Sequence, residues 1–62
     1  MLGDKIAYYR KQNSYTQEKL AELMNVSRQT IYKREENISK PEIDKLKKLI
    51  SILSISYNDL LN

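Results

Sequence analysis

The sequence predicts an all-α fold, with five short helices forming one compact domain over residues 1–62. Apolar residues recur three or four positions apart along most of the chain, which is the spacing of an amphipathic helix. Thr16, Ser27 and Ser56 stand directly before three of these periodic stretches, where a helix N-cap is expected. A chain of 62 residues is near the lower size limit for folding without disulfides or metals, so we expect a single domain.

The first helix is predicted over residues 2–12. Leu2, Ile6 and Tyr9 lie at i, i+4 and i+7 and form one apolar stripe. Turn-forming residues follow and end the helix, and Tyr15 returns an aromatic ring to the core.

Residues 16–36 are predicted to form two short helices joined by a three-residue corner. Asn25 tolerates the left-handed backbone that the corner needs, Val26 fills the corner, and Ser27 caps the next helix. Ala21 supplies the small side chain that two steeply crossing helices need where they meet. The residues that we assign to this structural frame are Thr16, Leu20, Ala21, Met24, Asn25, Val26 and Ile31.

The fourth helix is predicted over roughly residues 42–53, after a short connector in which Pro41 favours the helix start. Ser54 ends this helix, and Ser56 with Asp59 forms a capping-box pattern for a short fifth helix. The apolar stripe of the fourth helix, which we expect to complete the internal core, consists of Ile43, Leu46, Leu49, Ile50 and Leu53.

The positive charge is concentrated in the first half of the chain. The formal net charge is +3, with +4 carried by residues 1–34 and −1 by residues 35–62. A basic front half fits a nucleic-acid-binding face on the first three helices. Asymmetry of this size is also common on small soluble domains, so by itself it favours nucleic acid only slightly.

The residue types present leave little scope for catalysis. The chain has no cysteine and no histidine, which excludes thiolate and imidazole metal sites and a histidine-based catalytic triad. Asp4 and Lys5 interrupt the N-terminus before any apolar run, and the longest apolar stretch, residues 49–55, is far too short to span a bilayer. The simplest expectation is a cytoplasmic protein that is not an enzyme.

The corner and its flanks carry a specific resemblance. Residues 16–31 read TQEKLAELMNVSRQTI. This stretch resembles the Cro/repressor-type helix-turn-helix of the XRE family of bacterial and phage regulators. The similarity continues through KREENISKP and LSISYNDLL, and so covers nearly all of the chain.

The resemblance implies a lambda-repressor-like domain whose second and third helices form the helix-turn-helix. It implies a transcriptional regulator, with repression favoured, that binds double-stranded DNA sequence-specifically through the third helix in a major groove. A homodimer on a palindromic operator, without cofactor or metal, is implied as well.

Five positions depart from the family pattern. Ser14, Asn25, Asn37 and Ser54 stand where glycine is frequent, and Arg34 stands where a large apolar residue is frequent. The fold prediction is unaffected by these departures, but Arg34 leaves the packing of its helix face open.

Base readout is assigned to the third helix. Each residue turns a helix by about 100°, so with Ile31 pointing into the core, Gln29 and Lys33 point outward and Tyr32 lies on a flank. Arg28 sits at the N-terminal tip, the end that reaches bases. Arginine pairs bidentately with guanine and glutamine with adenine. The alternative, good helix formers on a solvated face, is less favoured because of the surrounding motif.

Phosphate contacts are expected near helix N-termini, where unpaired N–H groups attract anions. Gln17 at the start of the second helix is the first candidate, and the resemblance implies the same role. The residues assigned to phosphate contact are Gln17, Ser27, Lys40, Arg10 and Lys11.

Two further expectations concern packing and assembly. Arg10 and Glu35 match positions that form an ion pair in related repressors, and we expect them to meet here, partly shielded, and to brace the third helix against the first. Ile52 and Leu61 are left over once the predicted core is filled, which suggests a dimer patch. Two stray apolar side chains are equally ordinary on any surface, so both interpretations stay open.

The alternative function is a protein-interaction module on the same fold, such as an antitoxin-like subunit. The salt dependence of DNA affinity distinguishes the two functions, because binding through phosphates weakens steeply as the salt concentration rises. An enzyme is a third possibility, and no set of residues supports it.

Overall fold

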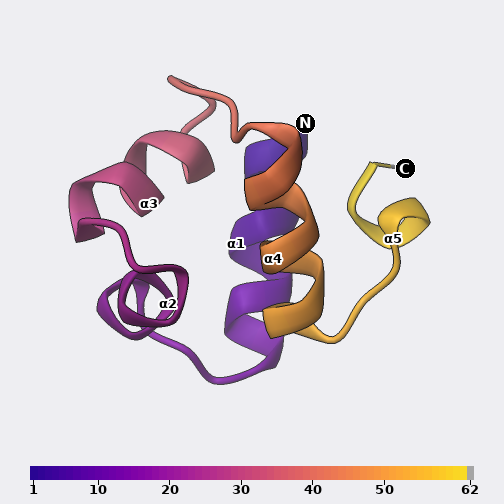
Figure 1. Cartoon of the computed structure of the whole chain (residues 1–62), viewed down its shortest axis with the longest axis horizontal. Helices are drawn as coiled ribbons and strands as arrows, with labels where there is room; N and C mark the ends of the chain where they lie inside the picture. The colour runs from indigo at the N-terminus through magenta and orange to yellow at the C-terminus, as the bar shows by residue number, and fades with distance from the viewer. Residues whose placement is uncertain (62) are drawn as a thin grey trace.

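The computed structural model describes residues 1–61 and consists of five α-helices (Figure 1). Their bounds are Leu2–Gln12 (α1), Gln17–Met24 (α2), Arg28–Glu35 (α3), Ile43–Leu53 (α4) and Tyr57–Leu61 (α5). In Figure 1, α2 and α3 lie on one side of α1 and α4, and α5 lies on the other. Helix α1 contacts α3 and α5, and α2 contacts α3 and α4. The predicted all-α, five-helix architecture is confirmed.

The predicted caps define the helix starts. The Thr16 hydroxyl accepts a hydrogen bond from the Lys19 N–H at 2.9 Å, which begins α2. The reciprocal capping box of α5 is present, because the Asp59 N–H donates to Ser56 Oγ at 3.1 Å and the Ser56 N–H donates to the Asp59 carboxylate at 3.0 Å. Helix α4 begins one residue later than predicted, with Glu42 as its N-cap. Pro41 is therefore not in the first helical turn.

Four residues other than glycine adopt the left-handed backbone conformation at the ends of helices. Ser14, Asn25, Asn37 and Ser54 have φ angles of 60°, 58°, 61° and 58°. These are the four positions at which the sequence departs from a frequent glycine. A side chain in this conformation places Cβ close to the following carbonyl oxygen, a strain that asparagine relieves better than serine.

The core lies where all five helices converge. Ala21, on α2, is buried, and α2 contacts α3, which is consistent with a small residue at a helix crossing. The fully buried side chains are Ile6, Leu20, Met24, Ile31, Leu49, Leu53 and Leu60.

The core assignment on α4 is wrong at two positions. Ile43 was expected inside, but it is the first residue of the helix and its surface is 71% exposed. Ile52 was expected to be left over, but it packs against the buried cluster. The core residues of α4 therefore lie toward its C-terminal end, where Leu49 and Leu53 are buried.

Gly3 allows the start of α1 to lie against the end of α3. A Cβ atom at Gly3 would lie 2.5 Å from the Glu35 carbonyl oxygen and 2.7 Å from Asn37 Oδ1, and would also clash with the Arg34 carbonyl oxygen. The Gly3 N–H donates to Asn37 Oδ1 at 2.8 Å. The single glycine of the chain thus permits a helix contact and is not used in a turn.

Candidate nucleic-acid interface

The outward side of α3 presents an exposed polar surface. Ile31 is buried and fixes the rotation of the helix, so Arg28, Gln29 and Lys33 are exposed and Tyr32 is 48% exposed. Within residues 1–61, none of these four exposed side chains forms a hydrogen bond or an ion pair. They are available to a ligand.

The same face has a slight hollow that suits a nucleobase edge. Arg28, Gln29 and Tyr32 line a shallow, open depression at the tip of α3. Two of these side chains carry hydrogen-bonding groups and the third offers an aromatic ring, which is the combination that reads donors, acceptors and methyl groups in a major groove.

Ser27 holds the tip in place. Its hydroxyl oxygen accepts a hydrogen bond from the Thr30 N–H at 3.2 Å and lies 2.9 Å from Thr30 Oγ1. This cap satisfies one backbone donor of the first turn of α3, and the side chain stays exposed.

A buried ion pair braces α3 from behind. Arg10 Nε donates to Glu35 Oε2 at 2.6 Å, and Arg10 Nη2 donates to Glu35 Oε1 at 3.1 Å. The two residues retain only 9% and 6% of their exposure. Arg10 Nη1 donates to the Tyr15 carbonyl oxygen at 2.9 Å, so the pair also holds the turn between α1 and α2. The expected meeting of Arg10 and Glu35 is present in the structure.

The same pair corrects one phosphate assignment. Arg10 was also assigned to phosphate contact, but each of its three guanidinium nitrogens donates within the protein. A guanidinium that is buried against a carboxylate is not free to bind DNA. Lys11, the neighbouring residue, is exposed at the end of α1 and keeps its ammonium in solvent.

Gln17 is joined to the buried pair. Its amide Nε2 donates to Glu35 Oε1 at 3.1 Å, and its side chain is partly buried. Because an amide nitrogen carries two hydrogens, one N–H remains for another acceptor. The start of α2 and the C-terminal end of α3 are therefore connected through one carboxylate.

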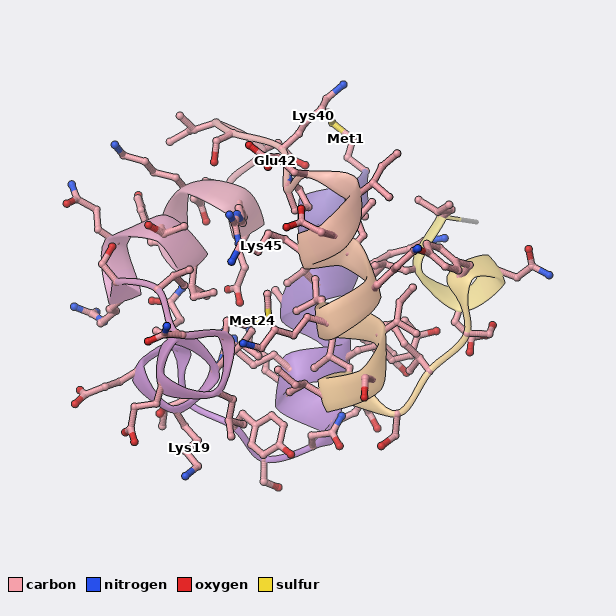
Figure 2. All side chains as sticks on the ribbon, viewed as in Figure 1. Met1, Lys19, Met24, Lys40, Glu42 and Lys45 are labelled. Carbon is pink, nitrogen blue, oxygen red and sulfur yellow. The ribbon has the colours of Figure 1, made fainter. Side chains whose placement is uncertain are left out.

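The remaining basic candidates are widely separated. Figure 2 shows Lys40 beside Met1 and Glu42 at the connector before α4, whereas Lys19 extends from α2 at the opposite end of the view. Lys40 is exposed. The structure does not gather all the assigned phosphate residues into one cluster.

The C-terminal patch is not formed as expected. Leu61 is 58% exposed, but Ile52 is only partly exposed because it packs against the core. Tyr57, on the same short helix as Leu61, is exposed instead.

Sequence reasoning missed three contacts that position the site. These are the approach of Gly3 to α3, the Asn37 side chain that accepts the Gly3 N–H, and the Gln17–Glu35 hydrogen bond. A lone glycine inside a predicted helix was a usable signal, because such a residue often marks close packing. The side-chain bonds had no sequence signal, since they depend on how the helices cross.

Two further observations concern metals and membranes. Residues 1–61 contain no group of three or more acidic, histidine or cysteine side chains that could hold a metal ion. In the described part of the chain, no helix has the length and apolar character needed to cross a bilayer.

Comparison with known proteins gives consistent matches. A family model described as Helix-turn-helix matches residues 6–60. The HTH-type transcriptional regulator SinR of Bacillus licheniformis is 35% identical over 63 residues, an alignment that covers 100% of this chain and 57% of SinR. The chain therefore spans little more than half the length of that relative. A crystal structure of SinR, the master regulator for biofilm formation, in complex with DNA superposes with a TM-score of 0.90, at 33% identity and 100% coverage of both chains.

Proposed function

The chain belongs to the helix-turn-helix family, and on that premise we propose that it is a transcriptional regulator that binds double-stranded DNA sequence-specifically. The observation that carries the proposal is the outward side of α3, where Arg28, Gln29, Tyr32 and Lys33 are exposed and form no bond within residues 1–61, on a helix braced by a buried ion pair. A similar domain, that of SinR, has been crystallised with DNA. This is a DNA-binding class and not an enzyme class, so we propose no catalytic site.

Base readout falls to the first turn of α3. Arg28 presents a fork of N–H donors that matches the O6 and N7 acceptors of guanine, and Gln29 presents the donor and acceptor that match adenine. Tyr32 lies one turn behind Arg28, and we assign its ring to apolar contact with a thymine methyl group. Lys33 points outward from the same helix and would reach a base or the adjacent backbone.

Phosphate contact falls first to Gln17. Glu35 holds one N–H of its amide, which fixes the orientation of the other N–H at the start of α2. The backbone N–H groups of the first turn of α2 lie at the same end and favour an anion. Ser27, Lys11 and Lys40, all exposed, are the further phosphate candidates.

The proposed binding unit is a homodimer on a palindromic operator. One recognition helix contacts few base pairs, so a single small domain gives limited affinity and specificity. Two subunits related by a two-fold axis place their α3 helices in major grooves about 34–36 Å apart. Residues 1–62 form one such DNA-binding domain, and repression is the favoured outcome of binding.

The test is a selection of bound sequences from random duplexes, followed by affinity measurement at several salt concentrations. We expect a palindromic consensus and an affinity that falls steeply as salt rises, because counterions are released from phosphates. Lys48→Ala, on the exposed face of α4, is the matched control for charge loss away from α3. No enriched sequence, with weak binding to every duplex, would instead favour the protein-interaction alternative of an antitoxin-like subunit.

A further inference from the structure

A depression lies between α1 and α5, on the side of the molecule away from α3 (Figure 1). Its volume is about 430 Å³, and it is open to solvent. The lining combines two aromatic rings with one cation and one anion, and none of its residues is assigned to DNA contact. The lining residues are Lys5, Tyr8, Tyr9, Asn58 and Asp59.

Tyr8 is a supported aromatic projection on this face. The residue is 57% exposed. Its ring meets that of Tyr9 edge to face, with the ring centroids 5.0 Å apart and the planes at 84°. Tyr9 packs against the buried core, so the Tyr8 ring rests on a fixed neighbour. A tyrosine held in this way loses little conformational entropy on binding, which is the property of an interface anchor.

Lys5 and Asp59 give the same face one charge of each sign. Lys5 is half-buried and forms no ion pair within residues 1–61. Asp59 is exposed, and its Oδ2 atom accepts the Ser56 N–H at 3.0 Å, whereas Oδ1 has no hydrogen-bond partner in the described part of the chain. The two side chains line one depression without pairing with each other. Each charge is therefore available to a group from outside.

A face that carries a projection, a depression and both signs of charge complements itself. A strongly acidic or strongly basic partner would leave either Asp59 or Lys5 against its own sign. A second copy related by a two-fold axis instead places Lys5 of each chain opposite Asp59 of the other, and Tyr8 of each chain at the depression of the other. This reciprocity is the defining property of an isologous contact.

The position of this face determines what such a contact joins. Helices α3 and α5 lie on opposite sides of α1 and α4 (Figure 1), and Ile31 is buried, so the base-reading side of α3 points away from α5. Two copies joined through α1 and α5 direct their α3 helices in opposite directions, at the ends of a body up to twice 26 Å long. A pair on one operator needs both α3 helices on the same side, about 34–36 Å apart. The back-to-back pair therefore suits two separate duplexes.

We propose that the α1–α5 face, which consists of Lys5, Tyr8, Tyr9, Asn58 and Asp59, binds a second copy of this chain and thereby bridges two DNA duplexes. The self-contact stands on the geometry of the free chain, whereas bridging rests on the proposed DNA-binding function. One end of a body of 26 × 23 × 19 Å offers a contact in the size range of weak, transient interfaces. The contact becomes effective where operators hold several copies at high local concentration.

The first arm of the test measures self-association of the free chain by dilution from near-millimolar concentration, with sedimentation and amide chemical shifts as the readouts. We expect a weak dimer whose dilution shifts the amide signals of Lys5, Tyr8 and Asn58. Tyr8→Ala lowers the association constant at least about tenfold, because it removes the anchor. Lys19→Glu, on α2 and remote from this face (Figure 2), changes it less than about twofold.

Exchange of the two charges tests the reciprocity. Lys5→Glu alone and Asp59→Lys alone each bring like charges together across the two-fold axis, so each protein by itself associates about fivefold more weakly. An equimolar mixture of the two proteins restores both opposite-charge contacts, and association recovers in the mixture only. Circular dichroism checks folding, because Asp59→Lys also removes one bond of the α5 capping box. If that variant does not fold, Tyr8→Ala alone decides this arm.

The second arm measures whether a duplex fixed to beads retains a second, labelled duplex, when each carries the selected operator. The unmodified chain retains the labelled duplex. Tyr8→Ala does not, although its affinity for a single operator stays within about twofold, because Tyr8 lies away from α3.

Three results overturn the proposal. A chain that stays monomeric to near-millimolar concentration leaves the face to a different partner. Association that depends on neither Tyr8→Ala nor the charge exchange uses another surface. Loss of cooperativity on a single operator in Tyr8→Ala, with bridging unchanged, shows that the face joins subunits on one duplex. Failure of the proposed function differs from all three, because no operator is bound by any variant and the dilution arm alone decides whether the self-contact exists.

Discussion

Glu35 is the residue on which the polar contacts behind α3 converge. Its carboxylate accepts from two nitrogens of Arg10 and from the amide of Gln17, and so joins α1, the start of α2 and α3. A surface ion pair contributes little to stability, whereas breaking one side of a buried pair strands the other charge. Helix α3 is therefore held by a contact in which replacement of either charged partner strands the other.

Replacement of one partner should show this directly. We expect Arg10→Met or Glu35→Gln alone to lower the free energy of unfolding by about 3–5 kcal/mol, and the double variant to lose less than the sum. Urea unfolding of the four proteins gives the coupling energy. Glu36→Gln, its exposed neighbour, should stay within about 0.5 kcal/mol of the original protein. A coupling energy of zero would mean that the two charges act independently.

Substitution of Gly3 by alanine is expected to change stability in the opposite direction from most helical glycines. Glycine to alanine inside a helix normally stabilises a protein by about 0.5–1 kcal/mol. At Gly3 the added Cβ would overlap carbonyl oxygens at the end of α3, so we expect Gly3→Ala to destabilise by about 1–3 kcal/mol. Ala7→Gly, in the same helix, is the control for propensity alone. A stabilised Gly3→Ala protein would contradict the close contact between α1 and α3.

Loss of a base contact and loss of a phosphate contact should affect operator and random DNA differently. Arg28→Ala is expected to lose about 1–3 kcal/mol on the preferred operator and to relax discrimination at one base position. Gln17→Ala is expected to weaken all duplexes evenly, because a phosphate carries no sequence information. Competition binding with the operator and with random duplexes measures both. Equal losses on both duplexes for Arg28→Ala would remove the base-reading role.

At the scale of the elements, the positions of the helices could be predicted from the sequence more accurately than the burial of individual side chains. Cap residues and turn residues fix where a helix begins and ends through local bonds, so the starts of α2, α3 and α5 were predictable. Burial depends on which neighbour reaches a given turn. Ile43 and Ile52 both fit an apolar stripe, and only the arrangement of the helices shows that the first is exposed and the second covered.

The same limit applies to the candidate site. The outward faces of Arg28, Gln29 and Lys33 followed from helix rotation about Ile31 and could be predicted. The resemblance predicted a partly shielded pair between Arg10 and Glu35, but neither helix pattern nor charge count indicated that both residues would be almost completely buried. That outcome depends on side-chain contacts across three helices.

The left-handed helix ends give a prediction at this scale. Ser14→Gly and Ser54→Gly should each stabilise the protein by about 0.5–1 kcal/mol, because glycine adopts the observed φ without the Cβ strain. Asn37→Gly should gain less, since the Asn37 side chain accepts the Gly3 N–H. Thermal unfolding compares them with Ser51→Gly, a helical control expected to lose stability. Equal losses at all four positions would exclude relief of backbone strain.

At the scale of the whole molecule, size limits how two copies can meet on DNA. The chain measures 26 × 23 × 19 Å, whereas half-sites read by a two-fold pair lie about 34–36 Å apart. The longest extent is shorter than this separation, so two such bodies centred on their half-sites can meet at most through side chains at their ends. A contact of that kind buries far less than the roughly 1,200 Å² of a stable interface.

We therefore expect the free chain to be a monomer at micromolar concentration and to pair on a palindromic operator. Leu61 is the exposed apolar residue at the end of α5, so Leu61→Lys should reduce cooperative binding of the second copy. Lys47→Gln, exposed on α4, should not. Sedimentation at micromolar and near-millimolar concentration measures the free state, and titration of duplexes with one or two half-sites measures the cooperativity. A dimer that forms without DNA and survives Leu61→Lys would show that another surface joins the subunits. Among the exposed apolar residues, Tyr8 on α1 and Tyr57 on α5 would then be the next to replace, because these two helices are in contact.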